Sequence, residues 1–261
     1  MPSKGDPSGL TVFGHVYPEQ SIKRFADPAT RKVAIYDLDA KKIRPKISPG
    51  SRIWFCAQWA WDQRAESGYM DMIEKEFQIT ASRVVVGGVR SLSSEEHAAI
   101  SRFFALWHLR AHQREHPEPD FYPTAVTPFS KEMEETLMGE KKELLGEQIE
   151  KAGVSFIRSG GRIPGRVQAG LHIQYTIDSL MMDNMFSQTQ WGIVTAMRGE
   201  FVIPDYISLD LQVVPVCPKI CFIAGQGNLP LRAAQVSQVN SALKNVARKY
   251  LIARDFRECQ F

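Results

Sequence analysis

A run of arginines and glycines in the middle of the chain has the residue types that bind anions. The segment "IRSGGRIPGR" carries Arg158, Arg162 and Arg166 among its glycines. Glycine frees backbone N–H groups to point at a ligand, and a guanidinium forms paired hydrogen bonds with phosphate. No Gly-Lys-Ser/Thr follows, so the segment is not a nucleotide-binding P-loop. We predict an anion contact at these three arginines. A flexible surface loop without a ligand is the ordinary use of such a segment and stays the alternative.

Three histidines recur at intervals of four residues on one predicted helix. His108, His112 and His116 would share a helix face, with Asp120 just downstream. Two imidazoles at this spacing can chelate Zn²⁺. However, the His-Glu-x-x-His pattern of zinc hydrolases is absent, and a helix C-terminus favours histidine through its dipole. The pattern therefore favours a solvated helix end over a zinc site.

The four cysteines do not form a metal-binding pattern. Cys217 and Cys221 are four residues apart, whereas Cys56 and Cys259 are isolated. A zinc ribbon needs a second close pair, and an unpaired cysteine packs as a small hydrophobic residue. We expect free thiols that are largely buried.

Composition and charge leave several function classes open but argue against a membrane protein. The 261 residues are 44% hydrophobic and 23% charged, as is usual for a globular protein. The formal net charge of +3 permits an anionic partner without requiring one. The chain shows no signal peptide and no run of about 18 apolar residues that would span a membrane. We expect a cytoplasmic protein with no membrane contact, and the sequence leaves its oligomeric state open.

The elements that must position these residues predict an α+β fold, with a helical middle, a mostly antiparallel C-terminal sheet and a closing helix. Residues 1–9 are predicted to be a mobile tail and residues 10–261 a single α+β domain. A hairpin is expected over 31–47, turning through Asp39, Ala40 and Lys41. Charged residues predict a solvated helix over 131–151.

Apolar periodicity predicts which helix faces point inward. The first helix should bury Met70, Ile73, Phe77 and Val84. The second, which starts after a serine cap at Ser93, should bury Ile100, Phe103, Phe104, Trp107 and Ala111. A later helix should point Leu171, Tyr175 and Met182 inward, and the closing helix Val236, Val239, Leu243 and Ala247.

In this order, the segments resemble a bacterial family called domain of unknown function 4238. "HVYPEQSIKRFAD" and then "VAIYDL" are similar to its His-x-x-Pro opening and following strand. "MIEKEF" resembles its helix with a central glutamate, and "FFALWHLR" its helix ending in Leu-Arg. "WGIVTA", "EFVIPD" and "VNSALKNVARKYL" are like its closing strand, Pro-Asp turn and helix. The chain departs from the pattern at Val16-Tyr17 and after Asp205, where no proline follows promptly. The resemblance covers most of the chain from His15, and it implies a fold more than a reaction because the family's activity is not established.

The motif positions of this resemblance implicate a catalytic set of His15, Asp37, Glu74, Arg110 and Asp205. In a metal-assisted hydrolytic site, carboxylates would hold Mg²⁺ or Mn²⁺, the histidine would move a proton, and the arginine would neutralise a phosphate. The same residues have structural uses: Asp37 can cap a turn, Glu74 and Arg110 can pair between helices, and His15 can hydrogen-bond the backbone. The enzymatic hypothesis requires them to converge in one cleft.

Two functions of different classes follow from these patterns. The first is a phosphodiester hydrolase, with or without a metal ion, that acts in bacterial conflict with mobile elements. The second is a non-enzymatic protein that binds a protein or nucleic-acid partner through the helical middle, a role that the charged helix over 131–151 suits.

Overall fold

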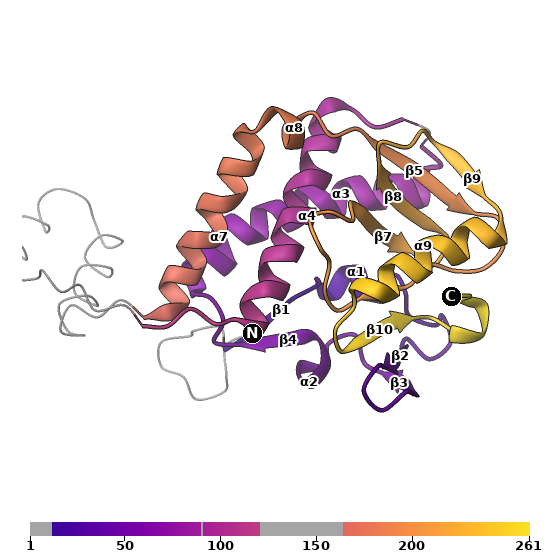
Figure 1. Ribbon diagram of the computed structural model, residues 1–261, viewed down its shortest axis with the longest axis horizontal. Coiled ribbons are helices and arrows are strands. Elements are labelled where there is room, and N and C mark those ends of the chain that lie inside the picture. Colours follow the sequence, from indigo (N-terminus) through magenta and orange to yellow (C-terminus); the bar gives the residue numbers. More distant parts are fainter. Residues whose placement is uncertain (1–11, 90, 121–163) are drawn as a thin grey trace, which may run out of the picture.

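The computed structural model describes residues 12–89, 91–120 and 164–261, and they form an α+β fold (Figure 1). The predicted tail over 1–9, the predicted helix over 131–151, Arg158 and Arg162 lie outside the described residues. The helices are α1 (Glu19–Lys23), α2 (Arg52–Phe55), α3 (Asp71–Gly87), α4 (Ser94–Glu115), α7 (Gly165–Met182), α8 (Asn184–Ser187) and α9 (Ala233–Val246). The strands are β1 (Phe13–His15), β2 (Val33–Asp37), β3 (Lys42–Ile47), β4 (Cys56–Gln58), β5 (Trp191–Ala196), β6 (Ile203–Pro204), β7 (Val213–Cys217), β8 (Ile220–Ala224), β9 (Leu229–Leu231) and β10 (Tyr250–Ala253).

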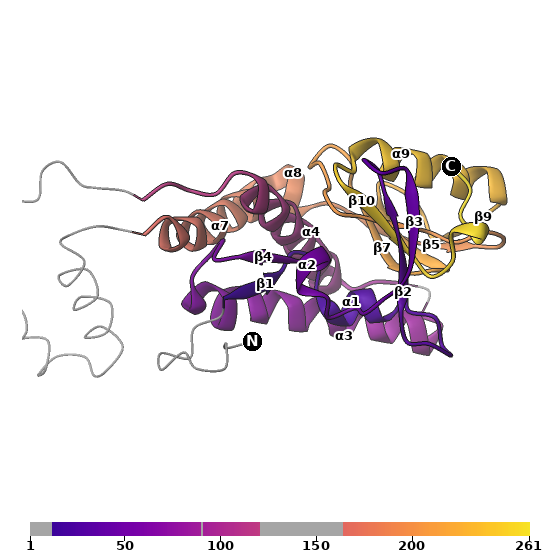
Figure 2. The same cartoon turned by 90° about the horizontal axis from the view of Figure 1, so that it is seen from below.

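Helix α4 is the central helix and packs against both α3 and α7 (Figures 1 and 2). It begins with a capping box, in which Glu96 N–H donates to Ser93 Oγ at 3.3 Å and Ser93 N–H donates to the Glu96 carboxylate at 2.8 Å. It ends just before Pro117, which cannot continue a helix. The faces predicted for α3 and α4 are buried, so both predictions are confirmed. None of the described helices has the length and apolarity needed to cross a membrane.

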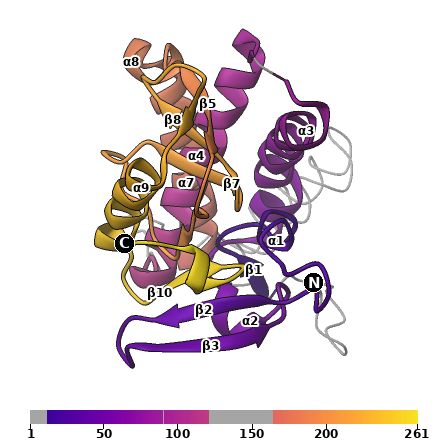
Figure 3. The same cartoon turned by 90° about the vertical axis from the view of Figure 1, so that its right-hand side faces the viewer.

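The strands form two four-stranded sheets and a two-stranded pair of β1 and β4. One sheet has the order β7-β8-β5-β9 and is antiparallel except between β5 and β9, which confirms the mostly antiparallel prediction. The other has the order β3-β2-β10-β6, which confirms the hairpin predicted over 31–47. Its strand β10 follows the predicted closing helix and lies between a strand from the beginning of the chain and one from its last third (Figure 3).

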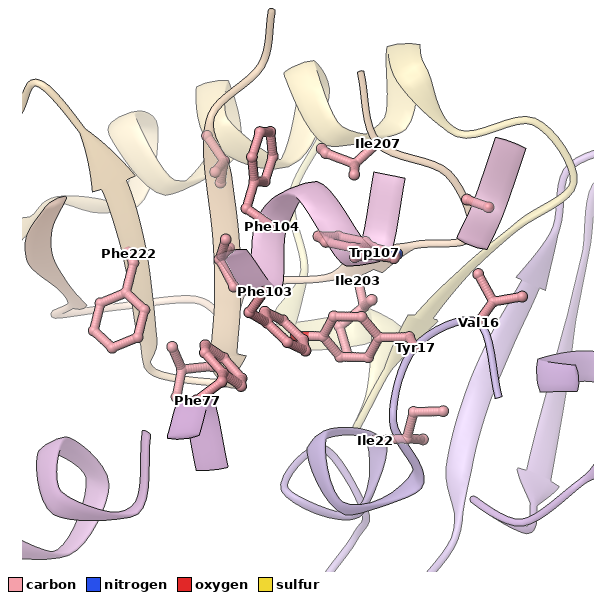
Figure 4. Close-up of a cluster of buried hydrophobic side chains, with 14 of the residues drawn as sticks. Val16, Tyr17, Ile22, Phe77, Phe103, Phe104, Trp107, Ile203, Ile207 and Phe222 are labelled. Atoms are coloured by element: carbon pink, nitrogen blue, oxygen red, sulfur yellow. The ribbon is translucent and has the colours of Figure 1, made fainter. Parts of the chain in front are cut away.

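Aromatic side chains join the helices to the sheet β7-β8-β5-β9 in one core (Figure 4). The rings of Phe77 on α3 and Phe103 on α4 stack with centroids 3.6 Å apart. Tyr17 contacts Trp107 edge-on at 4.6 Å, and its hydroxyl donates to the Pro215 carbonyl at 2.7 Å. Buried tyrosine needs such a partner, so this bond fixes the N-terminal segment against β7.

Two predictions for the segment after residue 157 are wrong. Leu171, Tyr175 and Met182 are 47%, 76% and 84% exposed. The buried face of α7 consists instead of smaller residues: Ala169, Gly170, Ile173 and Ile177. Here α7 approaches its neighbour so closely that a Cβ on Gly170 would lie 2.3 Å from Asp62 Oδ1, which leaves room only for small side chains. Arg166, predicted to lie in a loop, is in the first turn of α7.

The stacked ring pair generates a stability prediction. Phe77→Ala should lower the free energy of unfolding by about 3–5 kcal/mol, because it removes a fully buried ring and leaves a cavity. Ile79→Ala, on the same helix but 69% exposed, should change it by less than about 0.5 kcal/mol. Urea unfolding followed by circular dichroism measures both. Equal losses in the two variants would contradict this account of the core.

Candidate functional site

Two arginines continue the buried face of α4 toward its C-terminus. Arg110 and Arg114 lie three and seven residues after Trp107, so they occupy the same face as the apolar side chains. The Arg110 side chain is 1% exposed and that of Arg114 is 11% exposed. A buried charge is costly unless it is paired and hydrogen-bonded, so each guanidinium requires carboxylates from other segments.

Arg110 binds two glutamates. Its Nη1 donates to the Glu74 carboxylate on α3, and its Nη2 donates to Glu66 Oε2 at 3.0 Å. The indole N–H of Trp61 donates to the same Glu66 oxygen, and the Arg110 guanidinium lies over the Trp61 ring, 5.2 Å from its centroid. Burial alone would lower the pKa of Arg110, but the two carboxylates outweigh it and the pKa is raised. Burial raises the pKa of Glu74 more than Arg110 lowers it.

His15 lies beside this cluster at the end of β1. The Pro49 backbone carbonyl accepts a hydrogen bond from its ring, and its Nε2 is buried without a partner in the described chain. The donor is therefore Nδ1, and the neutral ring keeps a lone pair on Nε2. Burial lowers the pKa of His15 below the usual 6.5, although the Glu19 and Glu66 carboxylates oppose this shift. At neutral pH the ring is a proton acceptor.

Arg114 is held by Asp205. The Asp205 side chain, directly after β6, is 0% exposed and accepts a hydrogen bond from Arg114 Nη2 at 2.8 Å. It also accepts from the backbone N–H groups of Arg248 and Lys249, at 2.9 and 3.2 Å. Arg114 Nη1 donates in addition to the Tyr250 hydroxyl at 3.2 Å. Asp205 therefore fixes both the guanidinium and the turn that leads into β10.

A cavity of about 370 Å³ lies between these groups and the β2–β3 hairpin. It is lined by Asp37, Asp39, Ile53, Trp54, Cys56, Arg114, Lys249 and Tyr250. Cys56 on β4 is the cross-strand partner of His15 on β1. Directly opposed residues point to the same face with Cβ atoms about 5 Å apart, so His15 adjoins the cavity wall. Burial raises the pKa of the Cys56 thiol to about 11, which keeps it neutral.

The structure brings only part of the sequence-derived set to this cavity. Asp37 lines the cavity. Tyr250 on β10 is the register partner of Asp37, and Asp205 lies on the other side of Tyr250, after the next strand of the sheet. His15 adjoins it through Cys56, as described above. Glu74 and Arg110 pair with each other beside His15.

The structural alternatives for these residues are all observed. Asp37 accepts the Ala40 N–H at 3.0 Å and pairs with Arg44 at 2.9 Å, so it caps the hairpin turn. Glu74 and Arg110 form the expected helix-to-helix ion pair, and His15 bonds the backbone. Because Arg110 is buried and bound to two carboxylates, it is not placed to neutralise a phosphate. Arg114 lines the cavity in its place.

The proposed metal ligands do not gather in one place. Asp37, Glu74 and Asp205 each pair with a different arginine. Across 12–89, 91–120 and 164–261, no three His, Cys, Asp or Glu side chains are grouped to hold a metal ion. His108 has its own partner, since its Nδ1 lies 2.7 Å from the Ile207 carbonyl oxygen. Among these residues, the structure therefore shows no set of ligands for Mg²⁺, Mn²⁺ or Zn²⁺.

Apart from Cys56, the remaining sequence candidates do not line the cavity. Arg166, the one arginine of the predicted anion site within the described residues, stacks over the Trp59 ring at 4.9 Å. The four cysteines are free thiols, as expected; Cys221 and Cys259 are buried, and Cys56 and Cys217 are half-buried.

Sequence reasoning missed Arg114, Tyr250 and Glu66. A signal existed for Arg114, because its spacing from Trp107 continues the apolar stripe, whereas a solvated arginine would lie off that stripe. Tyr250 and Glu66 gave no comparable signal, because their roles depend on contacts with residues distant in sequence.

No known protein family, curated protein or solved structure matches this chain. The resemblance to domain of unknown function 4238 therefore stays a prediction.

The Arg110 cluster makes stability depend on pH in a defined direction. Folding raises the pKa of Glu74, so the folded state holds this proton more tightly and loses stability as the pH rises above about 4.5. Arg110→Gln removes the group that opposes this shift. This variant should lower the free energy of unfolding by about 3 kcal/mol at pH 7.5, and by less at pH 5.0, where Glu74 can take up a proton.

Urea unfolding of wild type and Arg110→Gln at both pH values measures the destabilisation at each pH. Groups that titrate alike in the two proteins cancel in this comparison. The control is Arg110→Gln with Glu74→Gln, whose destabilisation should depend less on pH. A cost for Arg110→Gln that is the same at both pH values would contradict the assignment.

Proposed function

We propose that the protein hydrolyses phosphodiester bonds in nucleic acid, with His15 as the proton acceptor. The observation that carries the proposal is the neutral His15 ring, whose Nε2 is buried without a partner beside a cavity that contains Arg114 and Lys249. A buried polar atom left unbonded is costly in a protein, and functional sites are one place where that cost is retained.

Each group near the cavity has a role in this reaction. In the resting structure Nε2 is shielded from solvent, so it must become exposed when substrate binds. His15 Nε2 then takes a proton from the attacking water, whose oxygen bonds to phosphorus as the bond to the leaving sugar oxygen breaks, and that oxygen takes up a proton from solvent. Arg114 and Lys249 bind the phosphate oxygens. Asp205 is a positioning residue that acts through Arg114, and Glu66, Glu74 and Arg110 form the polar network behind His15. A requirement for Mg²⁺ or Mn²⁺ is left to the assay.

The alternative function is binding of a partner through the helical middle. The charged helix over 131–151 that motivates it lies outside the described residues, so no structural observation favours it.

The proposal is tested by removing only Nε2. In His15→Asn the side-chain amide can replace Nδ1 as donor to Pro49, so the backbone contact is kept while the proton acceptor is lost. Cleavage of labelled DNA and RNA, with Mg²⁺, Mn²⁺ or neither, should fall about 10²–10⁴-fold, the usual contribution of a general base. His172→Gln, at a side chain that is 51% exposed, is the matched control and should cleave like wild type. Absence of cleavage by wild type under every condition, or equal cleavage by His15→Asn, would refute the proposal.

The pH dependence identifies His15 more specifically. Activity should fall at acid pH with a midpoint below 6.5, because His15 must be neutral and burial lowers its pKa. The Glu19 carboxylate raises that pKa, so Glu19→Gln should move the acid limb of kcat/KM to lower pH. Glu76→Gln, at a glutamate that is paired with Arg102 and does not affect the pKa of His15, should leave the limb in place. If Glu19→Gln does not move the acid limb of kcat/KM, the group that titrates in this limb is not His15.

A further inference from the structure

The cavity beside His15 has two charged side chains that are available to a ligand. Asp37 is paired with Arg44 and Arg114 with Asp205, each at 2.9 Å or less. Lys249, by contrast, is 57% exposed and its nearest carboxylate oxygen is 3.9 Å away, at the outer limit for an ion pair.

Asp39 is the second available charge. It is exposed on the hairpin turn, and no ion pair or side-chain hydrogen bond joins its carboxylate to another residue of the described chain. Among the described residues that line the cavity, Lys249 is thus a cation and Asp39 a hydrogen-bond acceptor without a close partner.

The wall between these charges is aromatic, and an arginine lies over each ring: Arg44 over Trp54 at 5.5 Å and Arg114 over Tyr250 at 5.8 Å from the centroid. Trp54 and Tyr250 meet edge-to-face, with centroids 5.6 Å apart and planes at 89°, and the neutral Cys56 thiol lies next to them. The Tyr250 hydroxyl donates to the Trp54 carbonyl at 2.5 Å, which fixes the pair. A flat aromatic group can stack on Trp54 in place of the Arg44 guanidinium, whose side chain is 44% exposed.

We infer that this cavity binds one unpaired nucleotide, so that the substrate of the proposed hydrolysis is single-stranded; this inference rests on the proposed function. The phosphate binds Lys249, the base stacks on Trp54, and Asp39 accepts a hydrogen bond from a sugar hydroxyl or a base amino group. The volume of about 370 Å³ is in the range of small-ligand sites, about 300–1,000 Å³. A base inside a duplex is stacked and paired, and it would have to leave the helix to enter.

Lys249 and Asp39 alone would also suit a small zwitterion such as an amino acid. The additional cations on the adjoining hairpin favour a polyanion instead. Lys42 on β3 is the register partner of Asp37, so its side chain lies on the face of the sheet that borders the cavity. Lys41, in the turn, and Lys42 are both exposed. The hairpin lies at the edge of its sheet, where a strand can pass along it (Figure 3).

Binding without cleavage tests this inference. His15→Asn protein is titrated with a fluorescein-labelled ten-nucleotide single strand and with the same sequence as a duplex, and anisotropy is followed. The single strand should bind at least about tenfold more tightly than the duplex. Trp54→Leu in the same background should weaken single-strand binding about tenfold, the usual effect of losing one stacked base.

Lys249→Gln tests the phosphate contact at an exposed position where folding is not at risk. It should weaken binding and reduce the slope of log K against log salt by about one. Lys75→Gln, at an exposed lysine on α3, is the control and should bind like the parent. Equal affinity for single strand and duplex, or unchanged binding by Lys249→Gln, would overturn the inference.

Cys56 reports occupancy of the cavity directly. A bound single strand should slow iodoacetamide alkylation of Cys56 but not of the half-buried Cys217, as quantified by peptide mass spectrometry. Protection of Cys56 by free amino acids and not by the strand would overturn the inference in favour of a zwitterionic ligand.

These results separate the two proposals. Single-strand binding with protection of Cys56, but no cleavage by wild type, would leave the cavity assignment standing and refute the hydrolase. Cleavage by wild type that Trp54→Leu leaves unchanged, together with equal affinity for single strand and duplex, would refute the single-strand inference and leave the hydrolase standing.

Discussion

Pairing of the two buried arginines of α4 is the constraint that the site depends on. A guanidinium on the inward face of a helix cannot stay solvated, and an unpaired buried charge costs several kcal/mol. Arg110 is paired by Glu66 and Glu74, which precede α4 in the chain, and Arg114 by Asp205, about 90 residues after it. One helix therefore fixes the π-helical turn over Ala65–Met70, α3 and the sheet around β10 relative to one another. The cavity lies at the Arg114 end of α4, against β10 and the β2–β3 hairpin.

The features that the sequence predicts well are those encoded by neighbouring residues. The start of α4 follows from Ser93 and Glu96, its end from Pro117, and its buried face from a repeat of three and four residues. The failure at α7 has the same origin. Its larger apolar residues indicated one inward face, but close approach to Asp62 and Ala65 selected the face with Ala169 and Gly170. Which face is buried depended on interhelical distance, and the sequence of α7 alone does not contain that distance.

The candidate site was predictable in residue type but not in partnership. The pairing of Glu74 with Arg110 was foreseen as a structural alternative, because both lie on predicted helices. The pairing of Asp205 with Arg114 was not, since it depends on β10 inserting between β2 and β6. The strand order also explains why Asp37 and Asp205 do not meet: Tyr250 occupies the strand between them, and carboxylates two strands apart are about 10 Å from one another.

The electrostatic balance around His15 connects this framework to the proposed chemistry. Burial makes the resting imidazole neutral, while Glu19 and Glu66 favour its charged form and Arg110 opposes it. When the ring takes up a proton during reaction, the two carboxylates are already in place to stabilise the imidazolium, and no rearrangement is needed at that moment. Burial keeps the pKa of the ring below 6.5, and Arg110 adds to that effect. In the proposed mechanism, the arginine that was expected to bind phosphate thus has a different part: with Glu19 and Glu66 it adjusts how readily His15 accepts a proton.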